Sequence, residues 1–186
     1  MIKTILLLNF FAVVCIAESP ELPPARCGII PKNVYSCMGN PRVVKPSASD
    51  KCVGADTQCD RMTCLFRESG FMIGDKVNTK KLTEHFDEFK KEFPEWTAAV
   101  DQLKTSCITN DLPPQGIYIN CPAYDVMMCA LTSFIRNVQP SQWSTAQDCA
   151  HARQYAAYCP VCPNDCFARL IPTGSCNSCQ LLPRSP

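Results

Sequence analysis

The sequence predicts an all-α fold, a compact disulfide-stapled bundle of about six helices. Apolar residues recur at helical spacing in several segments, whereas no segment alternates apolar and polar residues as a half-buried strand does. Cysteine is unusually frequent, with 15 among 186 residues. We expect one domain over 18–186, made of a Pro-rich arm (18–56), a helical core (57–159) and a Cys/Pro-rich tail (160–186).

Residues 1–17 are predicted to be a signal peptide. Lys3 gives a positive start, 4–16 are almost wholly apolar, and Ala17 supplies a small residue before the expected cleavage point. The apolar run is too short to span a bilayer, which takes about 20 residues. The interpretation is a secreted chain without membrane insertion, which starts at Glu18.

The mature chain has an even number of cysteines and balanced charge. Cys15 lies in the leader, so 14 cysteines remain, which suits seven disulfides in an oxidising compartment. Of 18 Lys and Arg residues, Lys3 is also removed, and the other 17 match 17 Asp and Glu residues. Because nucleic acid or an anionic membrane surface would require a basic patch, neither is an expected partner.

The helical core begins with a helix that holds Cys59 and Cys64. Its apolar side chains are Met62, Leu65 and Phe66. Gly70 can end this helix in the left-handed conformation, and a polar turn follows at 74–76. Ahead of this helix, the prolines of the arm leave room for only a short helix around 31–38.

Two amphipathic helices follow. Asn78 can cap the first of them, and Pro94 separates it from the next. Each carries an apolar stripe at i, i+4, i+7 and i+11, formed by Leu82, Phe86, Phe89 and Phe93, and by Trp96, Val100, Leu103 and Cys107.

A central helix is predicted over 123–138, opened by Pro122. It is apolar nearly all round, so it should be buried on more than one side. Beyond Pro140, Ser144 and Gln147 have the spacing of a capping box. That pattern predicts a last helix that carries Cys149, Tyr155 and Tyr158 and ends near Cys159.

No catalytic constellation is evident. His85 and His151 have no nearby serine or carboxylate pattern that suggests a nucleophile or a general base, and His85 is interpreted as a surface residue of an amphipathic helix. The calcium loop and the cysteine followed closely by His-Asp of a secreted phospholipase are missing. The prediction is a protein that is not an enzyme and has no cofactor.

Two CxxC pairs near the C-terminus, 159–162 and 176–179, have the spacing of a zinc ribbon. In an oxidising compartment disulfides are favoured over zinc. No metal site is therefore predicted.

The cysteine series resembles that of insect odorant-binding proteins. Members share six cysteines, with a short gap between the second and third and about eight residues between the fifth and sixth; the matching residues here are Cys37, Cys59, Cys64, Cys107, Cys149 and Cys159. Pro160 directly after the sixth cysteine, with further cysteines before and after, is similar to the Plus-C subfamily. The gaps depart from the pattern, with four residues after Cys59 and nine after Cys149.

The resemblance implies a disulfide pairing. It would join Cys37 to Cys64, Cys59 to Cys149 and Cys107 to Cys159. The remaining bridges would be formed by Cys27, Cys52, Cys121, Cys129, Cys162, Cys166, Cys176 and Cys179.

The resemblance also implies a function. Members are secreted carriers, in sensillum lymph or haemolymph, that hold small hydrophobic molecules such as odorants or pheromones in an internal helical cavity. A membrane odorant receptor is a further partner in that setting, and the carrier would be a monomer or a homodimer. The rival hypothesis is a secreted disulfide-rich inhibitor or defence protein whose Pro-rich tail is the active surface.

The predicted ligand contacts are apolar and aromatic side chains of the helices. Methionines among them are flexible and polarizable, which suits adaptable apolar surfaces. Ordinary core packing is the alternative for most of the set. A ligand would lie between the central helix and the helices over 96–107 and 149–158, against Met62, Leu65, Phe66, Phe86, Phe89, Val100, Leu103, Met127, Met128, Leu131, Phe134, Tyr155 and Tyr158.

Overall fold

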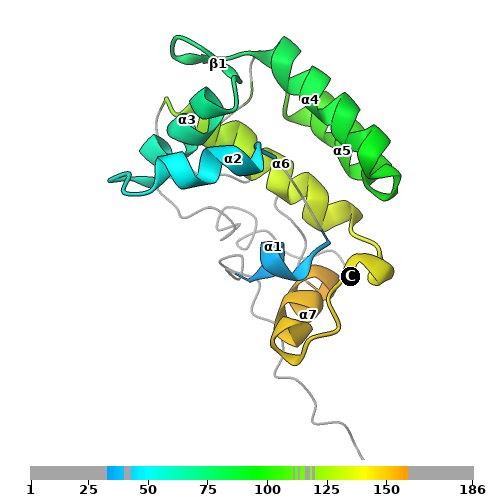
Figure 1. Cartoon of the computed structure of the whole chain (residues 1–186). Coiled ribbons are helices and arrows are strands. Elements are labelled where there is room, and N and C mark those ends of the chain that lie inside the picture. Colours follow the sequence, from blue (N-terminus) through cyan, green and yellow to red (C-terminus); the bar gives the residue numbers. More distant parts are fainter. Residues whose placement is uncertain are drawn as a thin grey trace, which may run out of the picture.

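The computed structural model describes residues 33–39, 43–110, 112, 114, 115, 118 and 120–158. Over these residues the fold is an all-α bundle stapled by disulfides, as predicted (Figure 1). The predicted signal peptide (1–17) and the predicted tail (160–186) lie outside the described residues. In chain order the elements are α1 (Val34–Cys37), α2 (Pro46–Ser49), η1 (Asp50–Cys52), α3 (Gln58–Glu68), β1 (Met72–Ile73), β2 (Lys76–Val77), α4 (Thr79–Glu92), η2 (Pro94–Trp96), α5 (Thr97–Ser106), α6 (Pro122–Asn137), η3 (Pro140–Gln142), η4 (Gln147–Cys149) and α7 (Ala150–Tyr158).

Local signals in the sequence set the ends of α3 and the start of α4. The Thr57 hydroxyl accepts a hydrogen bond from the Asp60 amide at 3.1 Å and caps α3. Gly70 follows the end of that helix with φ +79°, so the predicted left-handed stop is confirmed. The Asn78 side chain accepts from the Lys81 amide at 3.1 Å, which confirms the predicted cap of α4.

A short antiparallel hairpin joins these two helices, and the sequence analysis did not predict it. Met72 pairs with Val77 and Ile73 with Lys76. Gly74 takes a positive φ of 59° in the turn. Strands of two residues are too short to produce the alternating pattern by which strands are recognised.

Helices α4 and α5 form an antiparallel pair along one side of the bundle (Figure 1). Ion pairs cross between them at the surface, Lys104–Asp87 at 2.5 Å and Lys90–Asp101 at 2.8 Å. Their apolar stripes point inward. The buried residues of both stripes are Leu82, Phe86, Phe89, Trp96, Val100, Leu103 and Cys107.

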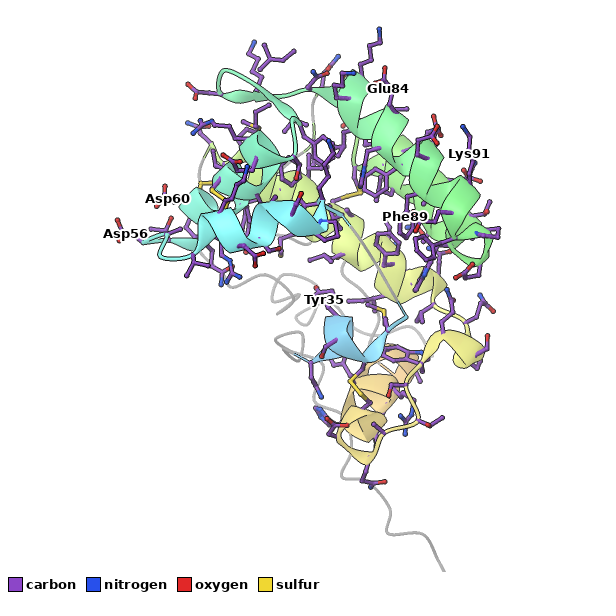
Figure 2. All side chains as sticks on the ribbon, viewed as in Figure 1. Tyr35, Asp56, Asp60, Glu84, Phe89 and Lys91 are labelled. Carbon is purple, nitrogen blue, oxygen red and sulfur yellow. A yellow bond between two sulfur atoms is a disulfide. The ribbon has the colours of Figure 1, made fainter. Side chains whose placement is uncertain are left out.

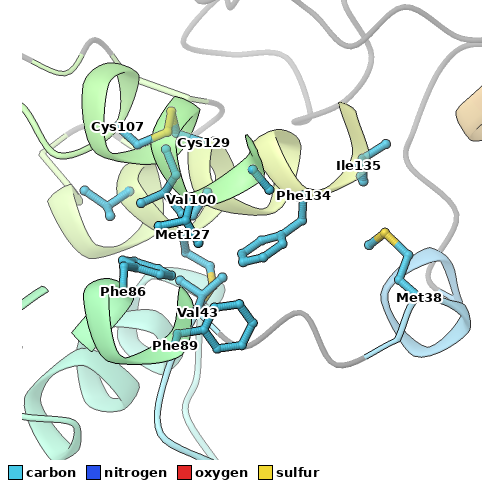
Figure 3. Close-up of a cluster of buried hydrophobic side chains, with 14 of the residues drawn as sticks. Met38, Val43, Phe86, Phe89, Val100, Cys107, Met127, Cys129, Phe134 and Ile135 are labelled. Carbon is cyan, nitrogen blue, oxygen red and sulfur yellow. A yellow bond between two sulfur atoms is a disulfide. The ribbon is translucent and has the colours of Figure 1, made fainter. Parts of the chain in front are cut away.

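Helix α6 is the central helix, as predicted. It packs most extensively against α5 and α3, and most of its side chains are buried. The Phe134 ring meets the Trp96 ring edge to face at 5.1 Å between centroids and the Phe89 ring at 5.8 Å. Figure 3 shows this cluster, in which α6 joins the α4–α5 pair to one core.

At the other end of the molecule, α1 lies against α7 (Figure 1). The Gly39 amide donates to the Gln142 carbonyl and the Ser144 amide to the Cys37 carbonyl, both at 2.8 Å. The predicted capping box at the start of α7 is wrong. The Ser144 hydroxyl accepts instead from the Ala146 amide, two residues along the chain, and the 3-10 helix η4 begins only at Gln147. The Arg153 guanidinium donates to the Ser144 and Ala146 carbonyls in the same segment.

No helix within the described ranges combines the length and the apolar character needed to cross a membrane.

Candidate ligand-binding site

Four disulfides are formed among the described residues, and they correct the pairing that the resemblance implied. Cys37 bonds Cys149 and not Cys64, Cys59 bonds Cys121 and not Cys149, and Cys107 bonds Cys129 and not Cys159. Cys64 bonds Cys52. Spatial neighbours decide the pairs: for example, Cys107 at the end of α5 meets Cys129 across the α5–α6 interface, with the Cα atoms 5.6 Å apart. The other seven cysteines lie outside the described residues: Cys15, Cys27, Cys159, Cys162, Cys166, Cys176 and Cys179.

The order of three of these bridges is nevertheless the order that the resemblance implied. In the series Cys52, Cys59, Cys64, Cys107, Cys121 and Cys129, the first bonds the third, the second the fifth and the fourth the sixth. The implied pairing had the same order on a different set of six. The interlocked pattern thus lies within residues 52–129. Cys37–Cys149 is an additional bridge that ties α1 to the start of α7.

Most of the predicted ligand contacts are core residues. Leu65, Phe66, Phe86, Phe89, Val100, Leu103, Met127, Phe134 and Tyr155 are buried, whereas Met62, Met128 and Leu131 are half-buried. The side chain of Tyr158 is outside the described part. Helix α5 packs directly on α6 and is cross-linked to it by Cys107–Cys129. The expected ligand position between the central helix and its neighbours stays a prediction.

The opposite side of α6 carries a second apolar stripe, hereafter the α6 stripe: Tyr124, Met128, Leu131 and Ile135. The residues that meet α5 lie on the other face, where the Asn137 amide group donates to the Gln102 side chain at 2.7 Å. Residues four and seven apart share one helix face, so the stripe is continuous. Tyr124 and Ile135 are buried, while Met128 and Leu131 keep part of their surface accessible.

Two further tyrosines, from α1 and α7, pack in the same hydrophobic core as α6. Tyr35 of α1 (Figure 2) has a pKa raised by burial and, secondarily, by the negative charges that Tyr155 of α7 and Tyr124 of α6 would carry on ionisation. Burial also raises the pKa of Tyr155, which is 5% exposed. Tyr35 and Tyr155 belong to helices that contact each other, α1 and α7. The sequence analysis missed Tyr35, since it lies in a one-turn helix among prolines and belongs to no periodic pattern.

One carboxylate is buried at the start of α6. Asp125 is 7% exposed and accepts a hydrogen bond from the Gln115 amide at 2.6 Å. Loss of hydration raises the pKa of Asp125 to about 6, although the hydrogen bond acts in the opposite direction. This contact fastens the connection before α6 to its first turn.

The sequence analysis interpreted His85 as a surface residue, and this is wrong. The His85 side chain is half-buried, and its ring lies against two aromatic rings. The centroid distances are 4.9 Å to Phe71 and 5.2 Å to Phe86. Within the described ranges no three His, Cys, Asp or Glu side chains gather as a metal site would require. The CxxC pairs lie outside these ranges.

Comparisons with known proteins do not assign the site. The chain matches no protein-family model, no curated protein and no solved structure. The α6 stripe is thus the candidate site on geometry alone.

Proposed function

We propose that the protein is a secreted, non-enzymatic carrier of small hydrophobic molecules, of the odorant-binding type. The observation that carries this proposal is the interlocked disulfide order, first to third, second to fifth and fourth to sixth, within a helical domain. Disulfides are typical of secreted proteins. Release into sensillum lymph or haemolymph, and delivery to a membrane odorant receptor, are further parts of the proposal.

The cross-links suit a carrier physically. Each one limits the unfolded chain and contributes about 2–4 kcal/mol of stability. They join α3 to α6 and α5 to α6, so the helices around the central helix keep their positions without relying on close packing at every face. A site for an apolar guest can then stay open without loss of the fold.

We place the ligand against the α6 stripe, on the side of α1 and α7. Met128 and Leu131 are the accessible apolar side chains there, and methionine adapts its shape to different guests. A ten-carbon molecule that buries about 300 Å² would gain roughly 7 kcal/mol at 25 cal/mol per Å². The ordering of side chains and the lost translational and rotational freedom of the ligand offset several kcal/mol of this gain. Micromolar affinity is therefore expected.

The test is binding of the fluorescent probe N-phenyl-1-naphthylamine to the full oxidised chain. Met128→Trp fills space on the α6 stripe and should weaken binding by about tenfold or more. Val53→Trp is the matched control, because Val53 is 83% exposed in the loop before α3 and should leave affinity unchanged. Circular dichroism should give the same helix content for all three proteins.

Failure of the wild type to bind the probe with a Kd below about 100 μM, roughly a hundredfold weaker than the micromolar affinity expected above, would contradict the carrier proposal. The inhibitor or defence hypothesis would then replace it. That hypothesis depends on the Pro-rich tail, which lies outside the described residues, and no observation in the structure favours it.

A further inference from the structure

The Cys52–Cys64 disulfide is one of two bridges, among the residues that the structure describes, that keep a cysteine partly accessible. Cys64 on α3 is half-buried, and its sulfur lies 4.0 Å from the carbonyl oxygen of Lys51, at the surface. Cys59–Cys121 likewise has one half-buried cysteine, whereas the other two described bridges join buried cysteines. Thiol–disulfide exchange requires access of a thiolate to a bridge sulfur. An external reductant can therefore reach the first two bridges while the protein is folded.

These two bridges differ in the part of the fold that must give way when they open. Cys59–Cys121 joins α3 to the start of α6, and those two helices pack extensively on each other. Cys121 itself is 1% exposed. Cys52–Cys64 instead joins α3 to η1, which follows the four-residue helix α2 at the edge of the bundle (Figure 1). Short surface elements open locally at a small cost in free energy, whereas core helices separate only near global unfolding.

Apart from the bridge, few interactions hold α2 and η1 against α3. Ala48 is the buried side chain of α2, and as an alanine it removes little apolar area from water. The Lys45 amide donates a hydrogen bond to the Ser69 hydroxyl at 3.2 Å. The Lys51–Glu68 ion pair, at 2.9 Å, leaves 65% of the Lys51 side chain exposed, and surface pairs of this kind add little stability. The bridge is thus the main restraint on this segment.

The loop that follows η1 adds little packing of its own. Residues 53–57 are all exposed, and the exposed fraction of Val53 reaches 83%. Gly54 has a positive φ of 90°, and a Cβ there would meet nothing within 4 Å. Once Cys52 is released, the segment 46–57 is held mainly by the chain at its two ends, while Cys59–Cys121 still fastens α3 to α6.

We propose that Cys52–Cys64 is a redox-sensitive switch, which an extracellular dithiol opens while the helical bundle stays folded. A thiolate of the reductant attacks the Cys64 sulfur, forms a mixed disulfide, and expels the Cys52 sulfur as a thiolate that takes up a proton. The second thiol of the reductant loses its proton, displaces Cys64 and closes the reductant's own disulfide, and the Cys64 thiolate is then protonated. Two electrons and two protons pass from the dithiol to the bridge.

Opening the switch changes one surface of the molecule. The segment 46–57 leaves α3 and becomes accessible to a protease, whereas α4, α5 and α6 keep their packing. The inference is independent of the proposed carrier function, because none of these residues belongs to the α6 stripe.

The experiment treats the full oxidised chain with dithiothreitol under native conditions. Newly formed thiols are alkylated with N-ethylmaleimide at successive times, and peptide mass spectrometry identifies the modified cysteines. Cys52 and Cys64 should be modified together, about tenfold or more faster than Cys59 and Cys121, because local opening needs less free energy than opening of the core. Circular dichroism should show unchanged helix content at that stage.

Limited trypsin digestion gives a second readout with an internal control. After partial reduction, cleavage should appear after Lys51, which lies in the released segment. Arg61 and Arg67 are exposed on α3 and should stay uncut, because Cys59–Cys121 still holds that helix on α6. The double variant Cys52→Ser with Cys64→Ser should be cut after Lys51 without any reductant.

Two results would overturn the switch. In the first, Cys59–Cys121 is reduced as fast as Cys52–Cys64 or faster. In the second, Cys52–Cys64 is reduced only as helix content is lost, with cleavage after Arg61 as fast as after Lys51. Both results leave the carrier proposal standing, since that proposal is tested by binding of the fluorescent probe to the oxidised chain.

Discussion

The Phe71 amide donates a hydrogen bond to the Phe66 carbonyl over 2.8 Å, and the two rings meet edge to face with centroids 5.9 Å apart. Between them, the Gly70 amide donates to the Arg67 carbonyl at 3.0 Å. This double hydrogen bond with its apolar contact is a Schellman motif. It turns the chain from α3 into the hairpin and places Phe71 in the core.

Replacement of Gly70 by alanine should destabilise the protein by about 1–2 kcal/mol, the cost of a left-handed residue with a side chain. The cost is purely conformational, because a Cβ at Gly70 would meet nothing within 4 Å. Urea unfolding of the oxidised protein measures it. Gly70→Asn is the control and should lose less, since asparagine tolerates this conformation. If the alanine variant were as stable as the wild type, a side chain at position 70 would cost nothing in the left-handed conformation, and the prediction would be wrong.

Shortening Phe134 to alanine should cost about 3–5 kcal/mol, because it removes a fully buried ring and leaves a cavity. The Phe134 ring contacts the rings of both Trp96 and Phe89. Its removal therefore weakens the packing of α6 against the α4–α5 pair. Ile73→Ala serves as the reference, since Ile73 is 67% exposed in the hairpin and should change stability little. Similar unfolding midpoints for the two variants would contradict the central position of Phe134.

The parts of this fold that could be predicted from the sequence are those decided by neighbours in the chain. Gly70 ends α3, Asn78 caps α4, and Pro122 opens the apolar helix α6. Each of these effects depends on contacts within a few residues along the chain. The disulfide pairing could not be predicted, because Cys107 faces Cys129 only once α5 has packed on α6. Tyr35 was missed for the same reason: its importance comes from α6 and α7, far along the chain.

The two bridges that start in or next to α3 should differ in their effect on stability. Cys59–Cys121 closes a loop with a sequence separation of 62, whereas Cys52–Cys64 closes one of 12. On the chain-entropy account, the longer loop should contribute about 1.5 kcal/mol more. The double alanine variants are well matched, since each removes one buried and one half-buried cysteine. Denaturant unfolding without reductant compares them, and a larger loss from the short loop would mean that native-state packing outweighs chain entropy.

The last prediction concerns the buried carboxylate of Asp125. Its pKa in the folded protein is about 6, above the ordinary value of 3.8. Between these values the folded state binds more protons than the unfolded state, so stability falls as pH rises from about 4 to about 6, by at most about 3 kcal/mol. Below that window both states are protonated, and above it both are ionised, so the contribution of this group is flat.

Asp125→Asn should remove this slope, because asparagine never ionises but still offers an oxygen to the Gln115 amide. The variant should be more stable than the wild type at pH 7 and nearly equal to it at pH 4, as measured by thermal unfolding across this range. Asp87→Asn provides a control of opposite sign. The hydrogen bond from Lys104 lowers the pKa of Asp87, so its contribution is lost as pH falls, and its removal should destabilise the protein at neutral pH. A stability difference between Asp125→Asn and the wild type that stays constant from pH 4 to pH 7 would mean that folding does not shift the pKa of Asp125.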